Sequence, residues 1–263
     1  MTTTKASESP RIVSLQQEIT NGEADALATF WREITEKGGP LIEPIEGDDG
    51  HYLVTFVWRD KGETKNVVIF AGPAGWDHPE KNQMARLLET DLWYKTYRVR
   101  SDLRMTYLLS PNDPLTDLDE EGKDFGTRLI ADPLNPRRFV YTKDEEIPDD
   151  RELVVSILEL PDAPAQPWIA PRPNVEKGRI EMYRRHSDIL KNERRVWIYT
   201  PPGYTTDGEA YGLLLLFDGL AYQDAVPTPT ILDNLLSEGK IPPLVVVLVD
   251  SLDQKTRNLE LPC

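Results

Sequence analysis

The chain is poor in cysteine, histidine and long apolar runs. Of its 263 residues, one is cysteine and three are histidine. The single Cys263 excludes an intrachain disulfide and permits a reducing compartment. The longest apolar runs, Leu213–Phe217 and Leu244–Val249, are too short to cross a bilayer, and residues 1–20 contain no apolar core of signal-peptide length. We therefore expect a cytoplasmic protein that does not enter a membrane.

Basic residues are fewer than acidic ones. The sequence has 30 basic and 45 acidic residues, and its formal net charge is -15. This charge disfavours nonspecific binding to nucleic acid or to an anionic membrane surface, so we expect no nucleic-acid partner. An anionic substrate would need a local basic pocket set against the overall field.

The first half of the chain is rich in strand patterns. Residues 1–10 are polar, and we expect them to be disordered. The apolar spacing of residues 23–36 predicts a helix. Short aromatic and β-branched runs then alternate with Gly, Pro and Asp turns, which is typical of antiparallel strands; they lie at residues 51–58, 66–70, 92–99, 104–110 and 152–160. We predict an immunoglobulin-like β-sandwich domain over residues 20–160.

A proline-rich segment follows this domain. Five prolines lie between Pro161 and Pro173. Proline fixes φ and lacks an amide donor, so we expect an extended linker at residues 161–175.

The residues after the linker, 176–263, follow a different pattern. Strands are predicted at 178–186 and 194–200. Two continuous apolar runs, at 212–217 and 244–250, are typical of strands buried on both faces, and a helix is predicted between them at 228–237. A strand–helix–strand order of this kind indicates a right-handed parallel unit in an α/β sheet.

Several strings, in order along the chain, carry a family resemblance. The second half contains RRVWIYTPPGY (194–204), LLLLFDGLAY (213–222), the long string from Val226 to Asp250 and RNLELPC (257–263). The first half contains VTFVWRD (54–60), WYKTYRVRSDLRMTYLLSP (93–111), DPLNPR (132–137) and LELPDAPAQPW (158–168). Together they resemble the enterochelin esterase family. Members are cytoplasmic α/β-hydrolases that open the ester bonds of catechol siderophores.

The resemblance implies hydrolysis by a serine, a histidine and an acid. The serine of such folds lies in a Gly-x-Ser-x-Gly turn, and the acid and the histidine follow it along the chain. Residues 1–263 contain no such turn, and all three histidines, at 51, 78 and 186, precede the place where it would be expected. We therefore assign no catalytic residue. We interpret residues 176–263 as the first part of a truncated hydrolase sheet, and we expect the chain by itself to be inactive.

The resemblance implies two candidate parts of a binding site, one loop and one arginine. The loop Asp218-Gly219-Leu220 would lie beside the active site, where an amide near Gly219 or Leu220 would form half of an oxyanion hole. The alternative is a plain turn that ends the strand. Arg257 would contact an anionic catecholate or a carbonyl oxygen. Its alternative is an ion pair with Glu260 or a nearby acid.

Other polar and aromatic groups favour structural interpretations. The arginines 184, 185, 194 and 195 indicate a solvated face rather than a pocket. Four aromatic residues, Trp93, Tyr94, Tyr97 and Tyr107, favour core packing over stacking on catechol rings. The acidic groups near Asp117 and Asp149 lack a recognisable calcium-loop spacing, so no metal site is assigned.

The resemblance therefore implies an enzyme that hydrolyses the ester bonds of a ferric catecholate siderophore and releases iron in the cytoplasm. Iron would arrive with the substrate, and the chemistry requires no cofactor. The alternative is a non-catalytic module for siderophore binding or oligomerisation. The apolar strands of an incomplete sheet would leave exposed edges, so we also expect self-association.

Overall fold

The computed structural model describes residues 8–118, 124, 127–147, 150–208 and 210–261. The chain divides into two compact units, one that ends at Pro164 and one whose main part begins at Ala165. Among the described residues, no helix combines the length and the apolar character that a membrane span requires.

Two helices begin the first unit. α1 (Pro10–Thr20) was not predicted, although its start follows ordinary capping rules. The Ser9 hydroxyl oxygen accepts a hydrogen bond from the Ile12 amide at 3.2 Å, and Pro10 opens the first turn, where no amide donor is needed. α2 (Ala26–Lys37) lies close to the predicted residues 23–36. The few apolar residues of α1 are buried because they pack against Phe30 and Ile34 of α2.

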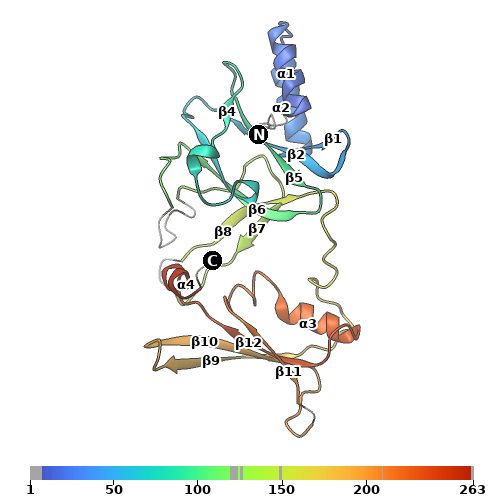
Figure 1. The fold of residues 1–263 in the computed structure, drawn as a ribbon, viewed down its shortest axis with the longest axis vertical. Coiled ribbons are helices and arrows are strands. Elements are labelled where there is room, and N and C mark those ends of the chain that lie inside the picture. The colour runs from blue at the N-terminus through green and yellow to red at the C-terminus, as the bar shows by residue number, and fades with distance from the viewer. Residues whose placement is uncertain (1–7, 119–123, 125–126, 148–149, 209, 262–263) are drawn as a thin grey trace, which may run out of the picture. The chain divides into compact units, whose positions relative to one another are not determined.

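Two four-stranded antiparallel sheets make up most of the first unit (Figure 1). One has the strand order β1-β2-β5-β4, and the other has the order β3-β6-β8-β7. The first sheet consists of β1 (Leu41–Ile45), β2 (Asp48–Arg59), β4 (Ala85–Arg86) and β5 (Leu92–Arg100). The second consists of β3 (Val67–Ala71), β6 (Arg104–Pro111), β7 (Arg138–Tyr141) and β8 (Leu153–Glu159). Two 3-10 turns, η1 (Gly72–Ala74) and η2 (Pro79–Lys81), follow β3. The five strands predicted in this half are confirmed.

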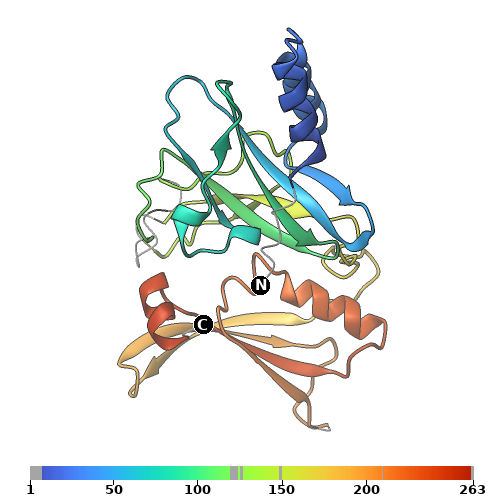
Figure 2. The ribbon, with the colours of Figure 1, turned by 45° about the horizontal axis from the view of Figure 1, so that its top comes forward.

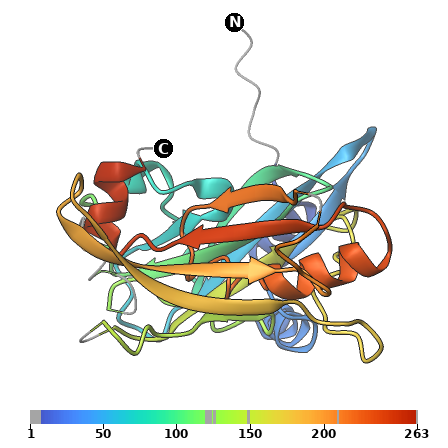
Figure 3. The ribbon, with the colours of Figure 1, turned by 90° about the horizontal axis from the view of Figure 1, so that it is seen from below.

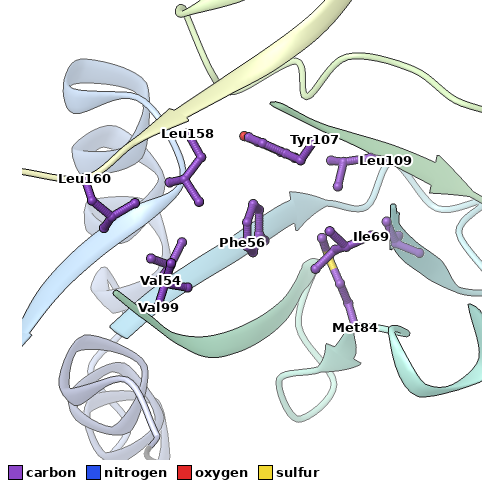
Figure 4. Packing of buried hydrophobic residues seen from close by; sticks show 10 residues of the cluster. Val54, Phe56, Ile69, Met84, Val99, Tyr107, Leu109, Leu158 and Leu160 are labelled. Carbon is purple, nitrogen blue, oxygen red and sulfur yellow. The ribbon is translucent and has the colours of Figure 1, made fainter. Parts of the chain in front are cut away.

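The core of the first unit draws side chains from both sheets. Phe56 from the first sheet meets Tyr107 from the second edge-on, with their ring centroids 4.7 Å apart. Aliphatic residues of both sheets surround this pair, as Figure 4 shows: Val54, Val99, Ile69, Leu109 and Leu158. Each large apolar side chain buried in this way contributes about 1.5–3 kcal/mol to stability.

The four aromatic residues singled out in the sequence belong to cores, as predicted. Tyr107 is fully buried, and its hydroxyl donates to Asp132 at 2.6 Å. Burial, and then the charge of Asp132, raise the pKa of the Tyr107 hydroxyl well above its ordinary value. Trp93 and Tyr97 pack against the same core as Tyr107, and Tyr94 packs against the helices.

The proline-rich segment is hydrogen-bonded rather than free. At its start, the Asp162 amide donates to the Ser101 carbonyl at 2.9 Å. Further along, the Trp168 indole donates to Glu238 at 3.0 Å, and the Asn234 side chain donates to the Trp168 carbonyl at 2.7 Å. Hydrogen bonds from Lys240, Trp168 and Arg172 lower the pKa of the Glu238 carboxyl to about 2, so it carries its charge at neutral pH.

The second unit contains a mixed four-stranded sheet with the order β11-β12-β10-β9 (Figure 3). Its strands are β9 (Arg179–Ser187), β10 (Asn192–Thr200), β11 (Gly212–Leu216) and β12 (Leu244–Val249). β9, β10 and β12 are antiparallel neighbours, whereas β11 and β12 run parallel and are joined through α3 (Thr228–Ser237). The predicted strands, helix and parallel pair are confirmed. A last helix, α4 (Gln254–Glu260), follows β12.

Only one face of this sheet is covered by helices. Figures 1 and 2 show α3 and α4 on the same side. On that side Trp197, Val246 and Leu248 pack against Leu232 of α3. On the other side, Leu213 is 74% exposed and Leu215 is 51% exposed. The prediction that 212–217 is buried on both faces is therefore wrong for the described residues, because β11 is an edge strand with one uncovered face.

Candidate functional site

The candidate site lies where the parallel strands β11 and β12 end. Asp218 comes two residues after the end of β11, and Ser251 comes two residues after the end of β12. Because β11 and β12 run in the same direction, their carboxyl ends lie at the same edge of the sheet. In open α/β sheets, loops at this edge are the usual place for a ligand.

Asp218 connects the two loops. Its carboxylate accepts two hydrogen bonds from the Arg257 guanidinium, both 2.9 Å long, and one from the Ser251 hydroxyl at 2.6 Å. Its φ of 55° lies in the left-handed region, which Asp tolerates better than most residues. Burial raises the pKa of the Asp218 carboxyl, but the bonds from Arg257 and Ser251 outweigh this effect, and the pKa lies below its ordinary value. The ion pair fixes an uncommon backbone conformation in the loop.

Gly219 brings this loop against the backbone of β12. Its amide donates to the Val249 carbonyl at 2.8 Å. A Cβ at this position would lie 2.9 Å from the Leu248 carbonyl carbon and 3.0 Å from the Val249 amide nitrogen, so only glycine fits. The next amide, that of Leu220, has no acceptor among the residues that the structure describes. Asp218 opens a helical turn, since its carbonyl accepts from the Tyr222 amide at 3.0 Å, and the Leu220 amide is one of the first amides of that turn, which lack internal partners.

Two arginines of β10 bind acids that follow β12, one in the loop and one in α4. Arg194 forms an ion pair with Glu260, and Arg195 donates to the buried Asp250 carboxylate at 2.6 Å. Both arginines are less than a tenth exposed. The interpretation of the arginine cluster as a solvated face is therefore wrong for these two residues. Arg257 forms an ion pair with a nearby acid, Asp218, while Glu260 pairs with Arg194; the contact of Arg257 with a catecholate or a carbonyl oxygen stays a prediction.

Three polar residues of this region were not singled out from the sequence. Ser251 bonds Asp218, and Asp250 binds Arg195; both directly follow the second apolar strand, which was the only signal that pointed to them. Gln223 lies in the turn after Leu220. Its side-chain oxygen is buried and has no hydrogen-bond partner among the described residues.

The histidines lie in other places. His51 contacts Asp48 at 3.0 Å, His78 lies 3.4 Å from Glu80, and His186 lies 3.5 Å from Asp188. In the described part of the chain, no group of three or more His, Cys, Asp or Glu residues is arranged to hold a metal ion. The site offers amide, hydroxyl and guanidinium donors, which suit recognition of a polar or anionic group, whereas the Asp218 carboxylate is occupied by Ser251 and Arg257.

The two units match two family models. Residues 187–262, in the second unit, match the one described as a putative esterase, and residues 53–169 match the one described as the N-terminal part of enterochelin esterase. The chain is thus similar, over most of both units, to proteins described as esterases, and the sheet of its second unit is of mixed type.

Individual relatives narrow this class. The chain is 31% identical to an iron(III) enterobactin esterase of Yersinia enterocolitica, over 91% of this chain and 73% of that protein. It is 32% identical to one of Escherichia coli O6:H1, over 89% of this chain and 59% of that protein. The chain belongs to the enterochelin esterase family. It spans little more than half the length of several of the curated relatives it matches.

Solved structures show the same likeness. Enterobactin esterase from Shigella flexneri, in the presence of enterobactin, matches with a TM-score of 0.58 and 29% identity, over 89% of this chain and 60% of that one. The Shigella flexneri enzyme is also known in the presence of 2,3-dihydroxy-N-benzoyl-serine.

Proposed function

We propose that this protein acts on the ester bonds of a ferric catecholate siderophore in the cytoplasm. Family membership supports the reaction, and the related enzymes are enterobactin and salmochelin esterases. The observation that carries the proposal is the Asp218–Arg257 ion pair, which ties together the loops at the carboxyl ends of β11 and β12. Iron enters as part of the substrate, and the protein brings no cofactor of its own.

Each site residue has a distinct role in this proposal. The Leu220 amide donates to the oxyanion that forms when the ester carbonyl is attacked. Asp218 and Gly219 position that amide, because the ion pair fixes one side of the turn and the contact with β12 fixes the other. Arg257 holds Asp218 and adds positive charge beside an anionic substrate, in a protein whose net charge is -15.

The finer architecture is also a proposal. We interpret residues 20–160 as an immunoglobulin-like sandwich, 161–175 as the linker and 176–263 as the first part of an α/β-hydrolase domain. The two antiparallel sheets with a shared core support the first assignment, and the parallel β11–β12 pair supports the last.

Residues 1–263 by themselves are proposed to bind the siderophore without hydrolysing it. They contain no Gly-x-Ser-x-Gly turn, and the acids that their histidines contact are Asp48, Glu80 and Asp188 rather than Asp218. A positioned amide stabilises an oxyanion only after a nucleophile has attacked the ester carbonyl. Without a nucleophile, we expect the chain to bind the siderophore but not to hydrolyse it.

A second candidate function is a non-catalytic module for siderophore binding or oligomerisation. The uncovered face of the second sheet favours it. Leu213 and Leu215 of β11 pair with Val245 and Val247 of β12, so all four share that face. An exposed apolar face of this kind favours association.

The test is a titration of ferric enterobactin into the purified chain, followed by tryptophan fluorescence, with the products analysed by mass spectrometry. We expect saturable binding and no linear hydrolysis product above a buffer control. Product formation would contradict the proposed inactivity, and absence of binding would contradict the proposed substrate.

A further inference from the structure

A second candidate site lies in the first unit, in a small apolar pocket on the sheet that contains β6 and β8. The pocket has a volume of about 160 Å³. Its floor includes Leu108, Leu153 and Val155, and its wall includes Trp76 and Tyr141. All of its lining residues belong to the first unit, and none of them contacts Asp218.

The alternation of side chains along the strands explains the floor. On β6, Tyr107 and Leu109 point into the core between the sheets, so Leu108 points to the other face. There Leu108 and Val155 form a second cluster, over which Leu129 packs from the chain after β6. Leu108 and Val155 are buried at the base of the pocket, and the pocket opens beside Leu153, which is only partly buried.

A strained loop supplies one wall. β3 ends at Ala71 with a φ of 58°, and Gly72 and Gly75 have φ values of 55° and 72°. The Ala71 amide donates to the Gly75 carbonyl at 2.7 Å, which closes the loop and brings Trp76 to the pocket. Positive φ costs a residue such as alanine free energy, and such strain is concentrated at functional sites. The loop therefore holds a tryptophan at an apolar opening.

The size and the lining both suit one aromatic ring. A cavity of about 150 Å³ lined by apolar side chains accommodates benzene. Trp76 is 47% exposed and Tyr141 is 38% exposed, so both rings have surface available for a ligand. Aromatic side chains favour offset or edge-on contact with another ring.

The charge of the pocket lining affects which ligands the pocket can bind. The pocket is lined by uncharged residues, and Thr106 and Tyr141 contribute hydroxyl groups. In a protein of net charge -15, an uncharged pocket does not repel an anionic ligand at close range. A catechol that binds iron has its oxygens at one edge of the ring and only C–H groups at the opposite edge, which is the edge that an apolar floor accepts.

We propose that this pocket is a subsite for one dihydroxybenzoyl ring of the siderophore, with its C–H edge toward Leu153, its face against Trp76 or Tyr141, and its iron-binding oxygens directed outward. The choice of this ring rests on the proposed function. The first unit would then contribute a site that recognises one ring, in addition to the candidate site at the Asp218 loop of the second unit.

The experiment uses the full chain with its tryptophans labelled with ¹⁵N, and 2,3-dihydroxy-N-benzoyl-serine as the probe. The Trp76 indole signal is assigned by its loss in Trp76→Phe. We expect this signal to shift saturably and Trp76→Ala to weaken binding at least about fivefold. Tyr204→Ala, which removes an aromatic side chain of similar exposure from the second unit, serves as the matched control and should leave the affinity unchanged.

The outcomes separate this proposal from the proposed function. If ferric enterobactin binds while the Trp76 signal stays fixed and Trp76→Ala binds equally well, the subsite is wrong and the proposed function stands. If neither compound binds any variant, both are wrong. Equal affinity for cyclohexanecarbonyl-serine would also overturn the subsite, since stacking on Trp76 and Tyr141 requires an aromatic ring.

Discussion

At the residue scale, Asp218 determines the geometry of the candidate site. It combines a left-handed φ with three side-chain hydrogen bonds to residues that lie more than thirty positions away. The cost of this φ is about 1–3 kcal/mol, which the bidentate arginine and the serine offset. A change at any of these three residues should therefore move the loop as a whole.

The ion pair predicts a pH dependence of stability. The folded-state pKa of Asp218 lies below its ordinary value of 3.8. Its contribution is therefore complete above that value and is lost as the pH falls through the folded-state pKa. At pH 7 we expect Asp218→Asn to be about 1 kcal/mol less stable than the wild type, and the difference should shrink towards pH 2. Urea unfolding of both proteins across this range measures it; a difference that does not change with pH would contradict the ion pair.

Gly219 provides a steric prediction. Gly219→Ala places a methyl group within 3.0 Å of the β12 backbone, which cannot move without disturbing the sheet. We expect a loss of about 2 kcal/mol in the free energy of unfolding. Gly212→Ala is the matched control, because its Cβ would meet only the Leu244 side chain at 3.5 Å. Equal stabilities of the two variants would show that the loop does not rest against β12.

Sequence reasoning found Asp218 and Arg257 but not the bond between them. The two residues are far apart along the chain, and the ion-pair alternative for Arg257 named Glu260 or a nearby acid without singling out Asp218. The burial of Arg194 and Arg195 was missed because strand alternation does not show which arginines meet a buried acid. Ser251 was missed since a single serine after a strand has no distinctive pattern.

At the element scale, helices and strands with a strong periodicity were predicted well. α3 lies at the predicted residues 228–237, and β11 and β12 match the two apolar runs. α1 was missed because its apolar residues are few and acquire their burial from α2. The apolar run of β11 indicated a strand but not its position at a sheet edge, which depends on which segments lie beside it.

The uncovered face of β11 predicts self-association. Leu213 and Leu215 are exposed apolar side chains on an edge strand, which favours pairing between molecules. We expect the double variant Leu213→Lys and Leu215→Lys to lower the average mass in sedimentation velocity. The control is Leu190→Lys, which alters a leucine that is 50% exposed in the turn between β9 and β10. A wild-type chain that sediments as a monomer at all concentrations would contradict the prediction.

At the scale of the whole molecule, the chain combines two units that each carry a candidate ligand contact. The proline-rich segment is hydrogen-bonded at its start to Ser101 in the first unit and further along to α3 in the second. Composition predicted an extended linker at residues 161–175, and that assignment stays a prediction. Composition did not indicate these bonds, because they depend on Trp168 and Asn234 rather than on the prolines.

The assignment of the siderophore site to the Asp218 loop is tested by comparing the affinity of ferric enterobactin for the wild type, Arg257→Met and Arg172→Met. Arg172 also pairs with a carboxylate of the second unit, that of Glu238, and so serves as the control. If the Asp218 loop forms the siderophore site, Arg257→Met binds about tenfold more weakly and Arg172→Met binds like the wild type. Equal affinity of all three proteins would contradict the assignment of the site to this loop.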